Sequence, residues 1–313
     1  MRQFLYISLT LLLFNSCKDE VELHSVWVKK NSPDTLYRNQ PVGFSIGDKG
    51  FIGLGYEAQI RADWWEYNSH NEQWTRKKDF PGGGRAFAFC ASDGQHGFIG
   101  LGFYFNRQTN ESKTYKDVWQ YDAATDQWSA LPDVPFTPQF RITPVSFVMN
   151  NQLYIQSNQQ LWSLDLTFNT WQRKNDPPFG IPNISIPQRN ANAIIVGSEV
   201  YVAINNASNS SVSYDTDLWK YIPQTDSWSL VKSKFENSTS ANIYWSSIES
   251  NVYKLGGYSN GNFGEYVNKQ VSFKLIGYPP TDGHYDEYSA VSYSIGNDIY
   301  YYFSNGKYWQ YVP

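Results

Sequence analysis

The stretch "WQYDAATDQW", Trp119 to Trp128, places two tryptophans nine residues apart on either side of a turn-like polar segment. The arrangement occurs three more times, as "WEYNSHNEQW" (Trp65 to Trp74), "WSLDLTFNTW" (Trp162 to Trp171) and "WKYIPQTDSW" (Trp219 to Trp228). Four copies of a pair of rare residues at one spacing indicate an internal repeat, and a repeat sets the architecture of the whole chain.

The sequence around the tryptophan pair predicts four short strands in each repeat. In the second unit these are "AFAFCAS" (86–92), "GFIGLGF" (97–103), "DVWQYD" (117–122) and the segment that starts at Trp128. β-branched and aromatic residues dominate each segment, and turn residues separate them. Trp119 and Tyr121 lie two residues apart, so they face the same side of their strand. We expect an all-β unit, with the polar segment Tyr104–Lys116 as a loop.

Such units start near Pro41, Ala86, Ile142, Ala191, Ala241 and Tyr288. Their second strands begin near Phe51, Phe98, Leu153, Val200, Val252 and Ile299, at spacings of 47, 55, 47, 52 and 47 residues. These spacings are typical of four-stranded propeller blades with loops of variable length. The sequence therefore predicts one domain over residues 25–313, an all-β, six-bladed β-propeller.

The unit resembles the kelch repeat, in which a strand ends in paired glycines and is followed by a Tyr and a Trp seven residues apart. The glycine pair is present in "YKLGG" (253–257), and the spaced pairs are Tyr67/Trp74, Tyr121/Trp128 and Tyr221/Trp228. In the third unit Leu164 replaces the Tyr before Trp171. The resemblance runs from about Ser25 to the end of the chain and implies a kelch-type propeller.

Both ends of the repeat region are incomplete. The last unit stops at "YWQYVP" (308–313), and "HSVWVKK" (24–30) is a strand-like segment with no unit before it. We expect the strand of Trp27 to become the outer strand of the last blade, which closes the ring and removes its exposed edges. Each Trp pair is then expected to fasten the outer two strands of its blade and to pack against the next blade.

The N-terminus resembles that of a bacterial lipoprotein. "FLYISLTLLLF" (4–14) is too short to span a bilayer and is typical of a signal peptide, so residues 1–16 are expected to be removed. Cys17 would then carry the lipid anchor, with residues 17–24 as the tether; the alternative is an ordinary cleaved signal with an unrelated cysteine. The "CKDE" that follows resembles an export tag, which implies a surface-exposed lipoprotein of the outer membrane.

Cys90 would be the remaining thiol, packed as a small apolar residue.

Charge disfavours nucleic acid as a partner. The net charge is −4, charged residues make up 17% of the chain, and no basic run is present.

Function is expected on the loops of the propeller face that also carries the blade-to-blade connections. The long loops of this face are predicted at Tyr56–Asp63, Tyr104–Lys116, Asn205–Asp215 and Tyr258–Asn268.

One arginine precedes the second strand by 11 to 13 residues in four units: Arg38, Arg85, Arg141 and Arg189. Two interpretations are open. The guanidinium groups could converge at the channel mouth and bind a carboxylate, sulfate or phosphate, or each could cap loop carbonyls of its own blade. Polar and aromatic residues of the same loops could complete a saccharide site: Tyr104, Glu265, Tyr266, Asp282, His284, Tyr285 and Glu287.

The four histidines of the chain limit the metal sites that it can form. A copper-radical oxidase site needs two histidines, and His284 alone is well placed, so copper and zinc sites are not expected, nor is any cofactor. The "FPGGGR" loop (80–85) resembles that of sialic-acid mutarotases, which implies Arg85 as the carboxylate partner and Glu265, Glu287 or His284 as the acid or base.

Three hypotheses follow for function. The first is non-catalytic binding of an anionic glycan or a protein partner at the loop-rich face. The second is a mutarotase-like sugar epimerase. The third is a structural subunit of a surface complex, with Tyr104, Phe105 and Phe263 as contacts.

Overall fold

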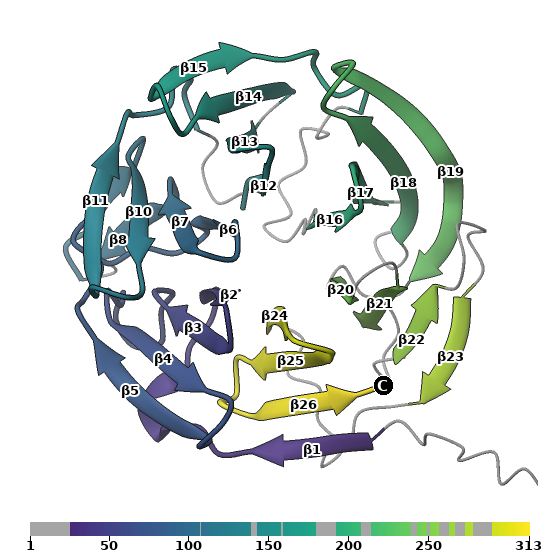
Figure 1. Ribbon diagram of the computed structural model, residues 1–313. Coiled ribbons are helices and arrows are strands. Elements are labelled where there is room, and N and C mark those ends of the chain that lie inside the picture. The colour runs from purple at the N-terminus through teal and green to yellow at the C-terminus, as the bar shows by residue number, and fades with distance from the viewer. Residues whose placement is uncertain are drawn as a thin grey trace, which may run out of the picture.

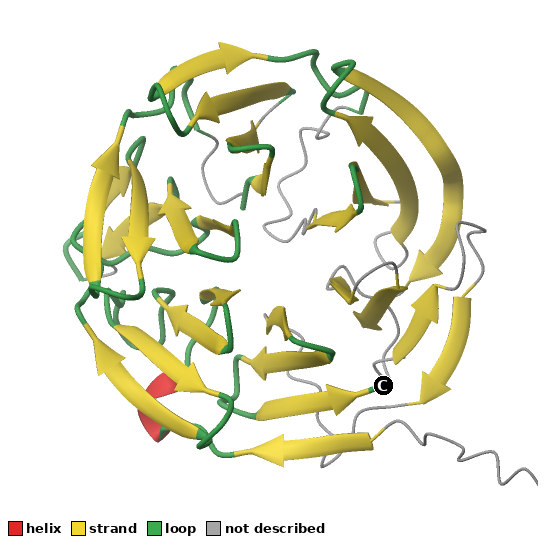
Figure 2. Cartoon of the chain, in the orientation of Figure 1, coloured by secondary structure: helices red, strands yellow, loops and turns green. Residues whose placement is uncertain are grey.

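The computed structural model describes residues 26–106, 108–138, 143–157, 159–179, 192–207, 214–238, 243–248, 251–256, 263–266, 273–277 and 290–313. Within these ranges, six four-stranded antiparallel sheets stand in a ring around a central axis (Figure 1). Strands account for nearly all regular structure (Figure 2), apart from the three-residue 3-10 helix Asp34–Leu36. The predicted all-β propeller is confirmed.

Each sheet runs from an innermost to an outermost strand. The first three are β2 (Val42–Ile46), β3 (Lys49–Gly53), β4 (Trp64–Asn68) and β5 (Gln73–Lys77); β6 (Phe89–Ser92), β7 (His96–Gly100), β10 (Val118–Asp122) and β11 (Gln127–Leu131); and β12 (Val145–Met149), β13 (Gln152–Ser157), β14 (Gln160–Asp165) and β15 (Thr170–Arg173). The next two are β16 (Asn192–Val196), β17 (Glu199–Ala207), β18 (Tyr214–Ile222) and β19 (Ser227–Ser238); and β20 (Ile243–Ile248), β21 (Asn251–Gly256), β22 (Phe263–Tyr266) and β23 (Phe273–Gly277).

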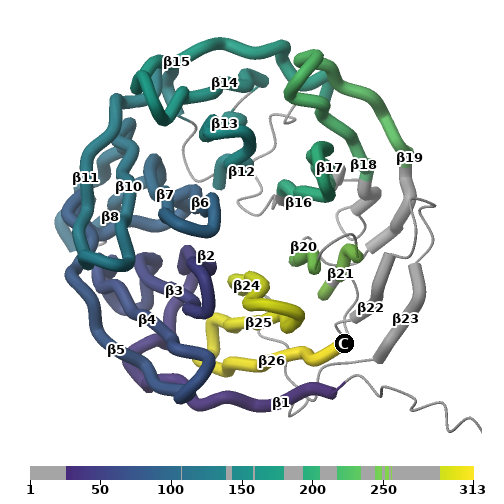
Figure 3. The backbone as a smooth tube through the Cα atoms, in the orientation of Figure 1, coloured from purple at the N-terminus to yellow at the C-terminus, as the bar shows by residue number. Residues whose placement is uncertain are grey.

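The remaining sheet joins the two ends of the chain. Its strands are β24 (Ala290–Ile295), β25 (Asp298–Phe303), β26 (Tyr308–Val312) and, outermost, β1 (Val26–Lys30). The register places Trp27 opposite Tyr311, and the Trp27 ring lies 5.2 Å from the Tyr311 ring and 5.7 Å from that of Tyr301. Figure 3 shows β1 running along the outside of β26. Closure by the strand of Trp27 is confirmed.

The innermost strands are joined to one another by side chains. The Cys90 thiol donates to the carbonyl of Gly43 at 3.2 Å, and the Ser146 hydroxyl donates to the carbonyl of Cys90 at 2.8 Å. Ser92, Ser247, Ser292 and Ser294 bond in the same way to the preceding innermost strand. The thiol and hydroxyl groups of these strands therefore supply hydrogen-bond donors to backbone carbonyls of the preceding innermost strand.

Glycines in the second strands admit large rings from the neighbouring sheet. A Cβ atom on Gly97 would overlap the Phe44 ring, and one on Gly50 would overlap Tyr293. The alternation of small and aromatic residues in "GFIGLG" thus has a direct packing cause. Sheets meet through aromatic side chains that lie on glycine backbone.

The second Trp of each pair fastens its sheet to the neighbour. The ring centroid of Trp128 lies 4.6 Å from that of Tyr121 in its own sheet and 5.5 Å from that of Trp64 in the preceding sheet. Its indole Nε1 also donates to the carbonyl of Lys78, in the segment that leaves the preceding sheet. Equivalent indole bonds join Trp74 to Asn31, Trp171 to Pro132 and Trp228 to Asn175. The predicted fastening role is confirmed, but the partner is the preceding blade rather than the next.

Parts of three predicted loops are strands. Residues of the expected loop Tyr104–Lys116 form a two-stranded hairpin, β8 (Phe103–Asn106) and β9 (Glu111–Thr114). Ends of the expected loop Asn205–Asp215 belong to β17 and β18, and Glu265 and Tyr266 lie in β22 rather than in a loop. The hairpin and the ends of β17 and β18 pair within their own segments, whereas Glu265 pairs with Tyr253 and Lys274, so local polarity alone misassigned these segments.

Candidate functional site

Arg38 is fully buried among residues of its own blade and of the turn before it. Its two terminal nitrogens each lie 2.7 Å from one carboxylate oxygen of Asp63, and it also donates to the carbonyls of Thr35, Leu36 and Leu54. Burial raises the pKa of Asp63, but the hydrogen bonds and charge of Arg38 outweigh that effect and hold the pKa below its usual value. All three nitrogens of the guanidinium group therefore donate hydrogen bonds to acceptors within the protein.

Arg85 repeats this geometry in the next blade. Its terminal nitrogens lie 2.5 and 2.9 Å from the carboxylate oxygens of Asp117, and its side chain is fully buried. It donates to the carbonyls of Gly82, Gly83 and Leu101 as well. The ring of Tyr115 covers the guanidinium carbon at 3.8 Å. A cation–π contact and a bidentate ion pair therefore saturate this group.

The two carboxylates share one sequence signal. Asp63 and Asp117 each lie two residues before the first Trp of a pair, and each accepts a 2.8 Å hydrogen bond from that indole, Trp65 or Trp119. In the third sheet Gln160 accepts from Trp162 in the same way, at 3.0 Å. An acid two residues before the paired Trp marks the partner of the arginine, a signal that the sequence interpretation did not use.

The expected ligand-binding role of Arg38 and Arg85 is therefore wrong, and so is the expected role of Arg85 as a sugar-carboxylate partner. A buried guanidinium group that already holds a carboxylate and several carbonyls has no donor to offer a ligand. The capping interpretation holds for both residues. Arg141, Arg189, Asp282, His284, Tyr285, Glu287 and Cys17 lie outside the described residues, and for Glu265 and Tyr266 the structure describes the strand alone.

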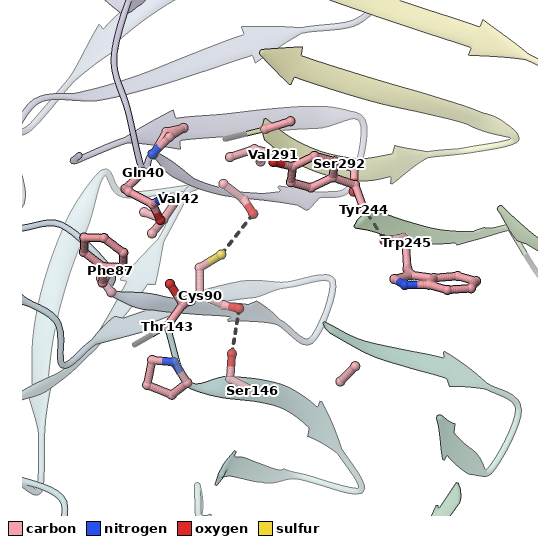
Figure 4. A pocket seen from close by; sticks show the side chains of 16 residues that line it. Gln40, Val42, Phe87, Cys90, Thr143, Ser146, Tyr244, Trp245, Val291 and Ser292 are labelled. Atoms are coloured by element: carbon pink, nitrogen blue, oxygen red, sulfur yellow. Dashed lines mark hydrogen bonds between the residues drawn. The ribbon is translucent and has the colours of Figure 1, made fainter. Parts of the chain in front are cut away.

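A cavity of about 210 Å³ lies on the axis, where all six innermost strands meet. Gln40, Phe87 and Thr143 lie together on one side of it, and Tyr244 and Trp245 lie opposite (Figure 4). The Cys90 thiol and the hydroxyls of Ser146 and Ser292 bond to neighbouring carbonyls, as the dashed lines in Figure 4 show for Cys90 and Ser146. Burial raises the pKa of the Cys90 thiol to about 11, so at neutral pH this cysteine is a protonated donor. It serves as a hydrogen-bonding lining residue, not only as the expected small apolar one.

A larger hollow of about 430 Å³ lies between the β3–β4 loop and the β8–β9 hairpin. We call it the loop groove; its lining residues are Tyr56, Glu57, Ala58, Gln59, Ile60, Tyr104, Phe105, Asn106 and Gln108. The rings of Tyr56 and Phe105 meet edge to face at 5.6 Å. Glu57 forms an ion pair of 3.1 Å with Arg61, and both are partly exposed. Of the predicted saccharide residues, the structure places Tyr104 in this groove.

The groove and the axial cavity are connected by aromatic rings. Phe87, at the cavity, stacks on Phe103 at 5.4 Å, and Phe103 stacks on Phe105 at 5.5 Å. Phe105 contacts Tyr56 at the far side of the groove. Both hollows therefore belong to one face, the face predicted to carry function.

The radial sheets and the closing strand define a β-propeller, and its Tyr–Trp pairs resemble those of the kelch repeat. No protein-family model and no curated protein matches the sequence, whereas 719 chains of solved structures match the fold. One of these is the structure of YjhT, with a TM-score of 0.64, 15% identity, and coverage of 90% of this chain and 94% of that chain. At this identity the likeness shows the fold alone.

Two further findings concern the described residues. None of their helices is long and apolar enough to cross a membrane. Nowhere in the described ranges do three His, Cys, Asp or Glu side chains gather as a metal site would require.

Proposed function

We propose that this protein is a non-catalytic binding protein that holds a glycan in the loop groove. The supporting observation is the composition of the groove: the rings of Tyr56, Tyr104 and Phe105 stand beside the amides of Gln59, Asn106 and Gln108. Aromatic faces pack on the C–H faces of sugar rings, and planar amides exchange hydrogen bonds with hydroxyl groups. A concave site with apolar walls and a few polar groups is the usual form of a small-ligand site.

The charge of the groove favours an uncharged sugar over the anionic one that the arginine pattern suggested. Arg38 and Arg85 are committed to Asp63 and Asp117, so they supply no positive charge at the surface. The ionic group on the groove wall is the carboxylate of Glu57, paired with Arg61. No Lys or Arg is among the lining residues of the groove, so its described walls offer no positive charge to hold an anionic ligand.

The test is a glycan-array screen of the purified protein, with Tyr56→Ala and Phe105→Ala beside it. We expect neutral oligosaccharides to bind, and each variant to lose at least about tenfold in affinity, or about 1.4 kcal/mol. The matched control is Phe168→Ala, which removes an aromatic ring that is 75% exposed in the β14–β15 turn. Equal binding by all four proteins would place the site elsewhere. An array with no bound glycan would contradict the proposal and favour a protein partner on the same aromatic residues.

For localisation we propose a lipid anchor at Cys17 that places the propeller at the outer surface of a bacterial outer membrane. The support is the sequence pattern of residues 1–20. We expect the protein to incorporate labelled fatty acid in a bacterial host, and Cys17→Ser to abolish the label, because acylation needs the thiol. Label retained in Cys17→Ser would contradict the anchor.

A further inference from the structure

The residues two positions after the capping arginines adopt a conformation that L-amino acids avoid. Gln40 has a φ of 52° and Phe87 a φ of 56°, in the left-handed region. For a residue with a side chain this costs about 1 kcal/mol or more, whereas glycine adopts it freely. An aromatic side chain at such a position is uncommon, and strained positions of this kind cluster at ligand sites.

The buried arginine caps impose this backbone. Arg38 fixes the turn before it through the carbonyls of Thr35 and Leu36, and Asn39 pairs with Tyr56 across an isolated bridge. In the next blade Arg85 is fixed in the same way, and Ala86 pairs with Phe103. The residue after each bridge is left-handed, and the innermost strand begins two residues later.

Gln40 and Phe87, presented in this way, line the axial cavity, and Thr143 lines it from an ordinary backbone conformation. These three residues come from three successive blades (Figure 4). They offer an amide, an aromatic face and a hydroxyl, which is the chemistry of the loop groove repeated at the axis. The stacked rings Phe87, Phe103 and Phe105 join the two hollows.

We propose that Gln40, Phe87 and Thr143 form an inner subsite that binds the terminal unit of the same neutral glycan, whose following units lie in the loop groove. This inference rests on the proposed function. Because residues from all six innermost strands surround the cavity, the end of a chain can enter it and the middle of a chain cannot. Side chains held on a fixed backbone lose little freedom on binding, which favours affinity.

The experiment uses Phe87→Gly and neutral oligosaccharides, from one to six units long, taken from the glycans bound on the array. Glycine suits the left-handed backbone, so the variant removes the ring without disturbing the turn. Asn150→Gly is the matched control, since Asn150 has a φ of 52° in the β12–β13 turn, away from both hollows. We expect Phe87→Gly to weaken binding at least about tenfold, Asn150→Gly to bind as the wild type does, and both melting temperatures to stay within a few degrees of wild type.

Chain-end entry has its own readout. A bulky fluorophore attached to one end of the oligosaccharide should abolish binding, and the same fluorophore on the other end should not. If both labelled forms bind equally, or if Phe87→Gly binds as the wild type does while Phe105→Ala is weakened, the inner subsite is wrong and the groove remains. If the wild type binds no glycan at all, the inner subsite fails together with the proposed function.

Discussion

Removing all residues up to Lys30 should lower the melting temperature of the propeller by at least about 10 °C. The deletion takes away β1, whose five residues pair with β26, and it strips the Trp27 ring from Tyr301 and Tyr311. Loss of a packed tryptophan alone costs about 3–5 kcal/mol, and the exposed edge of β26 adds to this. A total of roughly 5 kcal/mol corresponds to about 10 °C for a domain of this size.

The closing strand also carries contacts to the first blade. Lys30 forms an ion pair of 2.6 Å with Glu72, and the carbonyl of Asn31 accepts the indole hydrogen of Trp74 at 2.7 Å. The matched control is deletion up to Ser25, which leaves β1 in place and should melt as the full chain does. Thermal unfolding followed by near-ultraviolet circular dichroism measures both. Equal melting temperatures for the two deletions would show that β1 does not hold the ring closed.

Arg38→Met should destabilise the fold by about 3–5 kcal/mol at pH 7. The substitution keeps the apolar length of the side chain but leaves the Asp63 carboxylate, 10% exposed, without its cation. Removing one partner of a buried ion pair costs this much because the remaining charge is buried uncompensated. The control is Arg76→Met, which breaks an exposed pair with Asp79 and should cost below about 1 kcal/mol. Denaturant unfolding of both variants measures the difference.

The cost of Arg38→Met should depend on pH, and the direction follows from Asp63. In the native protein the pKa of Asp63 is lowered, so this residue adds stability above the pKa of the unfolded chain, near 3.8, and that contribution disappears as pH falls through the lower folded value. Without Arg38 the buried carboxyl favours its protonated form, so the deficit should be largest above about pH 5 and shrink toward pH 3. A deficit independent of pH would show that lost packing, not the buried charge, is responsible.

A second substitution separates the pair from its surroundings. Arg38→Met with Asp63→Leu should recover part of the loss, because two apolar side chains no longer leave a buried charge. Recovery should be incomplete, since the carbonyls of Leu36 and Leu54 and the indole of Trp65 lose their partners. A double variant less stable than Arg38→Met would contradict the ion-pair account.

Most of the fold followed from the tryptophan and glycine pattern. The second strands begin within a few residues of Phe51, Phe98 and Leu153, as predicted, and the closing strand of Trp27 pairs where expected. These features are local or periodic, so a reading of the chain alone can find them. The β8–β9 hairpin was missed because its second strand, β9, is polar throughout, so the pairing of Phe103 with Thr114 is not encoded in an apolar alternation.

The site was harder to predict for a different reason. The regular spacing of the arginines does place Arg38 and Arg85 at equivalent positions in two blades, but spacing alone does not show where the guanidinium groups point. That direction is set by Asp63, 25 residues after Arg38, and by Asp117, 32 residues after Arg85. The arginine spacing alone is compatible with both roles, and the side-chain contacts with Asp63 and Asp117 separate them.

The sequence by itself determined the repeat, the strand order and the closure of the ring, because these depend on residue periodicity and on the strand-like segments around Trp27 and Trp309. Only the tertiary structure decided that Arg38 and Arg85 serve the scaffold, and that Gln40 and Phe87, two residues further on, reach the axis. The physical reason is that a buried guanidinium group must find a carboxylate and carbonyls. The backbone that follows is held by these contacts, and Gln40 and Phe87 on it line the axial cavity.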